Sequence, residues 1–107
     1  MKKIANKLVR DNIPDIIRAN GGECTVRIME DDEYRQELIK KMHEEVDEFA
    51  SDNTAEELAD IFEVFIGLIS NSPYDMQDIL AITDKKREKN GGFKKKLYMS
   101  EYTDNRW

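Results

Sequence analysis

The stretch MHEEVDEFASDNTAEELADIFEVFIGLIS, residues 42–70, decides the fold that the sequence predicts. It contains two acidic clusters, EEVDE at 44–48 and EELAD at 56–60, separated by the short polar break SDNT at 51–54. Apolar residues accompany each cluster at the three- and four-residue spacing of an amphipathic helix, whereas the break carries turn-forming residues. The stretch therefore predicts two helices joined as a tight antiparallel hairpin, in an all-α protein.

The register of this hairpin brings carboxylates together. Residues at equal distances from the turn lie at equal heights, because each residue rises about 1.5 Å along either helix axis. Glu48 then lies opposite Glu57, and Glu45 lies opposite Asp60. Like charges about 4 Å apart repel by about 4 kcal/mol per pair in a surface-like dielectric, unless a cation lies between them. The sequence therefore predicts a divalent metal ion among these four side chains.

Glu45 lies in the middle of an apolar stripe on the first helix. The stripe consists of Tyr34, Leu38, Met42 and Phe49, and Val46 flanks it. A carboxylate at the centre of a buried stripe is costly unless it is paired or bound to a cation. The position therefore favours a functional role for Glu45, and the same argument applies to Asp60 on the second, largely apolar helix.

The second helix is apolar around most of its circumference, which is typical of a central helix. Its apolar residues are Leu58, Ile61, Phe62, Val64, Phe65, Ile66, Leu68 and Ile69. Its acidic residues, which recur at helical spacing, are Glu56, Glu57, Asp60 and Glu63. We expect such a helix, in a single domain of residues 1–107, to complete its burial against a second copy of the chain. The bundle is thus expected to be a homo-oligomer, with dimer and tetramer both open.

Structural roles explain some of these acids equally well. Thr54 followed by Glu57 fits a capping box, in which the glutamate only satisfies a free backbone N–H at the helix start. Glu44 points away from the apolar stripe, as a solvated residue does. Glu45 and Asp60 have no such explanation, so they are the strongest candidates for a site.

Composition and charge narrow the function classes. Charged residues make up 37% of the chain and its net charge is −6, which argues against binding nucleic acid through a broad basic face. An acidic protein can still bind a nucleotide when a metal presents the positive charge. The single cysteine, Cys24, cannot form an internal disulfide, and residues 1–10 lack the apolar region of a signal peptide. We therefore expect a cytoplasmic protein, with no membrane partner because no apolar stretch is long enough to span a bilayer.

The first third of the chain predicts a short helix and an extended segment. Pro14 suits the first turn of a helix that ends near Ala19, where glycines follow. Residues 23–29, ECTVRIM, alternate polar and β-branched or apolar residues, as a short extended segment does. The whole chain is thus expected to form a bundle of about four helices with one extended segment.

The boundaries of the three longer helices follow from capping and proline signals. The hairpin helices are expected at about 32–50 and 55–70. Ser72 before Pro73 fits an N-cap followed by proline at the first helical position, so a last helix is expected from there to about Lys89. The glycine pair that follows would terminate it.

Basic residues gather near the start of the chain and around Gly91 and Gly92. Cations at the end of a helix offset its dipole, which accounts for much of the second group without a ligand. Lys7 and Arg10 are better candidates, because they form a compact motif with Asp11. If these segments fold over the acidic site, their cations would neutralise phosphates that the carboxylates alone repel.

Four segments carry a resemblance to a known family: KLVRDNIP at 7–14, EEVDEF at 44–49, EELADIFEV at 56–64 and GGF at 91–93. In this order they resemble the MazG-like all-α nucleoside triphosphate pyrophosphohydrolases, and in particular their small phosphoribosyl-ATP pyrophosphohydrolase-like subgroup. The acidic hallmark of that family, EExxE followed by ExxD, is matched by Glu44, Glu45, Glu48, Glu57 and Asp60. The chain departs from the pattern in a shorter gap between the acidic motifs and at Asn90, where related chains often carry arginine.

The resemblance implies an oligomeric enzyme that hydrolyses a nucleoside or deoxynucleoside triphosphate between the α and β phosphates, in house-cleaning of the nucleotide pool. It implies Mg²⁺, or Mn²⁺ as a substitute, held by Glu45, Glu48, Glu57 and Asp60. Glu63 is expected as a further ligand or as a hydrogen-bond partner of a ligand. The catalytic candidates that act on the attacking water are Glu44 and Glu45. The phosphate-binding candidates are Lys7, Arg10 and Lys86.

Two other functions remain open at this point. Phosphoribosyl-ATP is an alternative substrate, if the label of the subgroup is taken literally. A helical regulatory or nucleotide-binding module without catalytic turnover is the other alternative, because acidic helices also serve as partner surfaces. The sequence does not reveal base or sugar specificity, since selectivity comes from pocket shape and a few polar contacts.

Overall fold

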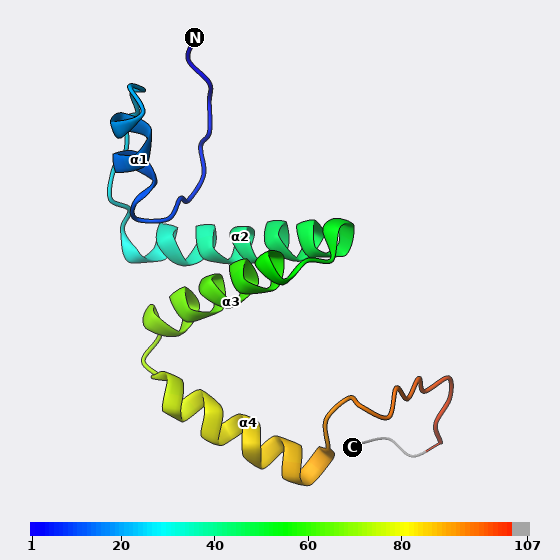
Figure 1. Ribbon diagram of the computed structural model, residues 1–107. Helices are drawn as coiled ribbons and strands as arrows, with labels where there is room; N and C mark the ends of the chain where they lie inside the picture. The colour runs from blue at the N-terminus through cyan, green and yellow to red at the C-terminus, as the bar shows by residue number, and fades with distance from the viewer. Residues whose placement is uncertain (104–107) are drawn as a thin grey trace. The chain divides into compact units, whose positions relative to one another are not determined.

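The computed structural model describes residues 1–103 of the chain, and this part contains four helices and no strand (Figure 1). The helices are α1 Ile13–Ala19, α2 Asp31–Asp52, α3 Ala55–Ser70 and α4 Met76–Asn90. The predicted all-α class is therefore confirmed. The chain separates into two compact parts, one from Met1 to Asp75 with α1 to α3, and one that begins at Met76 with α4. The single domain expected over 1–107 stays a prediction.

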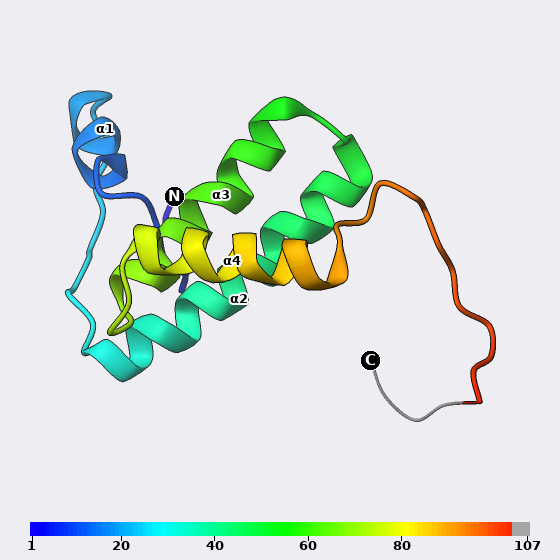
Figure 2. The ribbon, with the colours of Figure 1, turned by 90° about the horizontal axis from the view of Figure 1, so that it is seen from below.

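Helices α2 and α3 form the predicted antiparallel hairpin, and they lie side by side in both ribbon views (Figure 1, Figure 2). The turn is tighter than the expected break at 51–54, because only Asn53 and Thr54 lie outside helix. Asn53 adopts the left-handed conformation with φ 54°, and its N–H donates to the Phe49 carbonyl at 2.8 Å. The Thr54 hydroxyl accepts a hydrogen bond from Glu57 N at 3.2 Å, which caps α3.

The core of the first part lies between α2 and α3. Leu38 on α2 is 3% exposed, and Val64 and Ile69 on α3 are each 8% exposed. Gly67 allows the helices to approach closely, because a Cβ at this position would lie 2.9 Å from Leu38 Cδ2. Glu45 is the buried charged residue of this core. A small core therefore positions a carboxylate at the helix interface.

The remainder of this first part consists of α1 and the irregular segments before α2. Pro14 lies in the first turn of α1, as predicted, and Gly22 N donates to the Ile17 carbonyl at 2.9 Å beyond its end. Residues 22–30 form neither helix nor strand, and they run as a long irregular connection from α1 to α2 (Figure 2). Arg27 fastens this connection to α2, since both of its Nη atoms donate to the carboxylate of Glu33 at 2.7 Å.

Helix α4 begins later than the sequence predicts. Ser72 and Pro73 do not cap α4, which starts at Met76. The Ser72 hydroxyl instead donates to the Ile69 carbonyl at 2.6 Å and accepts from Tyr74 N at 3.2 Å, so it serves the end of α3. None of the described helices combines the length and the apolarity needed to cross a membrane.

Candidate metal centre

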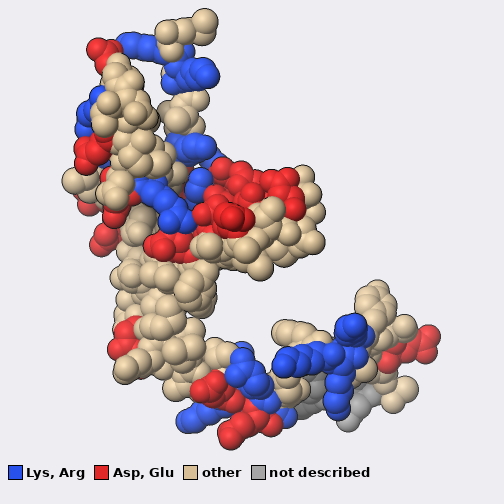
Figure 3. All heavy atoms as spheres, in the orientation of Figure 1, with Lys and Arg blue, Asp and Glu red and all other residues tan. Residues whose placement is uncertain are grey.

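Three carboxylates from the two hairpin helices converge. Glu45 on α2 and Glu57 and Asp60 on α3 each offer one oxygen, and these oxygens lie within 4.8 Å of one another. The register predicted from the sequence placed Glu45 opposite Asp60, and the structure brings both into this group. In Figure 3 the acidic atoms form a patch over the hairpin, with basic atoms at its edge. We refer to Glu45, Glu57 and Asp60 as the acidic triad.

Glu45 is the most unusual member of the triad. It is 6% exposed, and its Oε2 atom is buried and makes no hydrogen bond with the described residues. Burial raises the pKa of the Glu45 carboxyl, and the nearby charge of Glu48 raises it further, whereas Lys41 lowers it. An unpaired buried carboxylate oxygen is costly, so this atom is suited to bind a cation.

The structure shows the Thr54 half of the predicted capping box and places the Glu57 carboxylate with the other acids. Partial burial of the carboxyl group away from water is the main cause that raises the pKa of Glu57. The charge of Glu48 and a hydrogen bond with Asp52 raise this pKa further. Partial burial and the neighbouring acids therefore both disfavour the charged form of Glu57.

Two basic side chains contact the triad. Arg10 Nη2 lies 2.8 Å from Asp60 Oδ1, and Lys41 Nζ lies 3.4 Å from Glu45 Oε1 and 3.5 Å from Glu44 Oε1. Lys41 was missed by the sequence analysis, although its place one helical turn before both glutamates was the available signal. Both cations reduce the repulsion among the carboxylates.

A cavity of about 570 Å³ opens beside the triad. It lies within the first part of the chain, between the segment before α1, α1 itself and the α2–α3 hairpin. Its charged lining consists of Arg10, Asp11, Lys41, Glu45, Asp60 and Glu63. Its volume is within the roughly 300–1,000 Å³ of typical small-molecule sites. A ligand in this cavity would meet carboxylates from both helices and cations from two segments.

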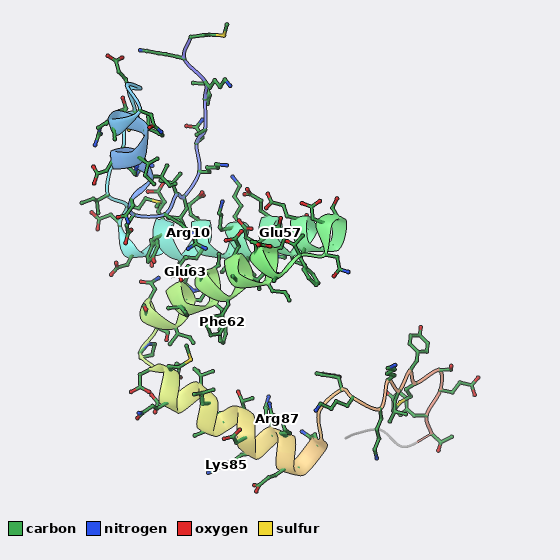
Figure 4. All side chains as sticks on the ribbon, in the orientation of Figure 1. Arg10, Glu57, Phe62, Glu63, Lys85 and Arg87 are labelled. Carbon is green, nitrogen blue, oxygen red and sulfur yellow. The ribbon has the colours of Figure 1, made fainter. Side chains whose placement is uncertain are left out.

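Three other predicted site residues do not belong to the acidic triad, and their surroundings differ. Glu48 is exposed and is not one of the triad, but its charge acts on both Glu45 and Glu57. Glu63, labelled in Figure 4, lines the cavity one turn beyond Asp60. Glu44 contacts Lys41 and does not line the cavity.

The other two predicted phosphate-binding residues lie in different parts of the chain. Lys7 is exposed and is not part of the cavity lining. Lys86 is exposed on α4, in the second part of the chain. Arg10 is a predicted cation that the structure places at the triad, where it contacts a carboxylate. The phosphate-binding roles of all three stay predictions.

Comparison with known proteins gives one partial match. An uncharacterized protein of Mycolicibacterium smegmatis is 46% identical over 48 residues, which cover 45% of this chain and 49% of that protein. The chain thus matches about half the length of this curated relative, whose name assigns no activity. No family model matches the chain, and no solved structure gives a significant match. The fold and the site therefore define a helical protein with a carboxylate-rich candidate metal centre.

Proposed function

We propose that the chain is a Mg²⁺-dependent pyrophosphohydrolase of nucleoside triphosphates. The observation that carries this proposal is the unpartnered, buried Oε2 of Glu45 beside the carboxylates of Glu57 and Asp60. The hydrolase function itself rests on the resemblance to MazG-like enzymes, which the acidic motifs carry. The fold is compatible with that resemblance, because it is all-α and presents both motifs on one hairpin.

The acidic triad fits Mg²⁺ by the chemistry of its donors. Carboxylate oxygens and water are the ligands that Mg²⁺ prefers, and Mn²⁺ accepts the same set. Glu45, Glu57 and Asp60 would hold the ion, and Glu48 or Glu63 would join them directly or through water. A bound divalent ion would supply the positive charge that lets a triphosphate approach this acidic surface.

The surrounding residues suit a phosphate-bearing substrate. In the reaction, the oxygen of a water molecule bonds to the α-phosphorus and the bond to the α–β bridging oxygen breaks, which gives a monophosphate and pyrophosphate. Lys41 and Arg10 place positive charge at the cavity, where the phosphates would lie. Glu44 contacts Lys41 at 3.5 Å but does not line the cavity, so its role toward the attacking water stays a prediction from the sequence.

Assembly into a homo-oligomer is part of the proposal. Phe62 and Leu58 on α3 are 55% and 52% exposed, although they lie on the most apolar helix of the chain. In Figure 4 Phe62 projects from α3 on the side away from α2. A second copy that packs against this side would remove the apolar surface from water. We also propose that the protein acts in the cytoplasm, where its nucleotide substrates are found.

Release of pyrophosphate tests the proposed function. Canonical, deoxy, oxidised and deaminated triphosphates, together with phosphoribosyl-ATP, are incubated with wild type in Mg²⁺ or in EDTA. The same panel is repeated with Glu45→Gln and with the control Glu56→Gln, an exposed residue of α3 outside the triad. We expect Mg²⁺-dependent release that Glu45→Gln abolishes and Glu56→Gln preserves.

The pattern of substrates separates the alternatives. Release from phosphoribosyl-ATP alone would replace the proposed substrate class with that compound. A folded wild type that releases pyrophosphate from no member of the panel would refute the hydrolase and favour a regulatory or nucleotide-binding module. Equal activity in EDTA and Mg²⁺ would refute the metal requirement.

A further inference from the structure

Arg10 occupies the position of a counter-ion for the acidic triad. Its Nη2 lies 2.8 Å from Oδ1 of Asp60, and the two residues are 50 positions apart in the chain. Asp60 is thereby the triad member whose charge is directly compensated from outside the hairpin. A metal ion that binds the three carboxylates needs the electron pairs of the same Asp60 group. Arg10 and the metal ion would therefore be like-charged partners of one carboxylate group, and they would repel each other there.

The two cations at the triad differ in their freedom to leave it. Lys41 projects from α2 itself, its side chain is 20% exposed, and it contacts two glutamates of the same helix. The Arg10 side chain is 57% exposed and belongs to an irregular segment before α1. An exposed ion pair contributes little to folding, so Arg10 can exchange its partner at small cost. Lys41 is therefore held beside the triad by its own helix, whereas Arg10 can leave the triad.

We propose that Arg10 is an exchangeable internal cation that holds Asp60 in the metal-free protein and leaves it when a divalent ion binds. This inference rests on the metal site of the proposed function. The Arg10–Asp60 pair lowers the repulsion among the three carboxylates in the metal-free protein. It also weakens metal binding, because the ion must displace Arg10. Release of Arg10 then leaves a guanidinium at the cavity edge, next to the bound metal.

The exchange predicts that loss of Arg10 tightens metal binding. Mn²⁺ is titrated calorimetrically into nucleotide-free wild type, Arg10→Ala and Arg18→Ala, with circular dichroism as the check on folding. Arg18 is the matched control, because it is an exposed arginine whose salt bridge, at 3.9 Å, is with Asp15 of the same helix. We expect Arg10→Ala to bind Mn²⁺ about two- to fivefold tighter than wild type, the range of an exposed ion pair. Arg18→Ala should match wild type.

The guanidinium of Arg10 gives a second readout. Its side-chain ¹⁵N signals, assigned by their absence from Arg10→Ala, are recorded at low temperature during a titration with Mg²⁺. We expect the signals to shift and to exchange faster with water as the site saturates, because the ion pair with Asp60 is lost. A cation that only lies near the site would keep its signals unchanged.

The outcomes distinguish the exchange from the metal site itself. If wild type binds Mn²⁺ and Arg10→Ala has the same or a weaker affinity, the exchange is refuted while the proposed function stands. An equal gain in Arg18→Ala would also refute it, because net charge would then explain the effect. If folded wild type binds no Mn²⁺, the metal site fails, and with it both the exchange and the proposed function.

Discussion

Glu45 and Asp60 face each other across the α2–α3 interface. One carboxylate oxygen of each residue, and one of Glu57, lie within 4.8 Å of one another. The charge of Asp60 contributes to the raised pKa of Glu45, so the two groups interact electrostatically. One of them is buried in the core and the other is paired with an arginine from the N-terminal segment. The site is therefore part of the packing between the helices, and its charge affects the stability of the fold.

The stability of the metal-free protein is expected to fall as the pH rises. The folded-state pKa of Glu45 is raised, chiefly by burial, and that of Glu57 is raised by partial loss of water. Between the unfolded and folded pKa values the folded state binds more protons, so the free energy of unfolding decreases with increasing pH. Thermal unfolding in EDTA should thus show a higher Tm near pH 5 than near pH 7. A Tm that rises over this interval would contradict the assigned burial.

Glu45→Gln is expected to stabilise the metal-free protein at neutral pH. The amide has nearly the same shape as the carboxylate but carries no charge. Burying an unsatisfied charged group costs on the order of 1 kcal/mol or more, and the substitution removes this cost. Urea unfolding in EDTA at pH 7 measures the difference, and Glu56→Gln at an exposed position is the control. The gain should shrink as the pH falls, because wild type then gains the same neutrality by protonation. A destabilised Glu45→Gln would show that Lys41 already compensates the charge.

Mg²⁺ is expected to raise the Tm of wild type. A ligand that binds only the folded state stabilises it by about 2.7 kcal/mol at one hundred times its Kd. Asp60→Asn and Glu57→Gln each remove one carboxylate that would bind the ion, so the rise should be smaller or absent in both. Scanning calorimetry with and without Mg²⁺ measures this. The same rise in wild type and both variants would place the metal elsewhere.

Leu38→Ala is expected to destabilise the hairpin strongly. Leu38 is 3% exposed and packs against Gly67, so truncation leaves a cavity between the two helices. Comparable substitutions cost about 2–5 kcal/mol. Ile28→Ala is the control, because Ile28 is fully exposed and its loss leaves no cavity. Equal effects of the two substitutions on urea unfolding would argue against a core between α2 and α3.

Phe62→Glu is expected to dissociate the proposed homo-oligomer. The Phe62 ring is 55% exposed and lies 6.4 Å from the Phe65 ring, so the two form one apolar surface on α3. A charge at the centre of a buried interface is strongly unfavourable. Light scattering after size exclusion measures the mass of wild type and variant, and Phe93→Glu, at 98% exposure, is the control. A wild type that is already monomeric would exclude the proposed assembly.

The sequence predicted the hairpin and its register because both depend on local signals. Alternating apolar and acidic positions fix the faces of α2 and α3, and the expected span 55–70 for α3 is the one observed. The start of α4 was wrong, because the Ser72 side chain can cap the next helix or bond back to Ile69 and the sequence does not distinguish the two. The contact of Arg10 with Asp60 follows no periodicity, since it depends on how the N-terminal segment crosses the hairpin.

The turn at Asn53 and Thr54 has a consequence for how this protein can evolve. Surface loops usually accept insertions and deletions, because nothing downstream depends on their length. Here one added residue would rotate α3 by about 100° relative to α2 and carry Asp60 away from Glu45. Among chains that keep a two-residue turn, the interval between these two acids should therefore remain constant even where the sequence of the turn drifts. Within that group of chains, the fixed interval is a criterion by which proteins with the same centre can be recognised in genomes.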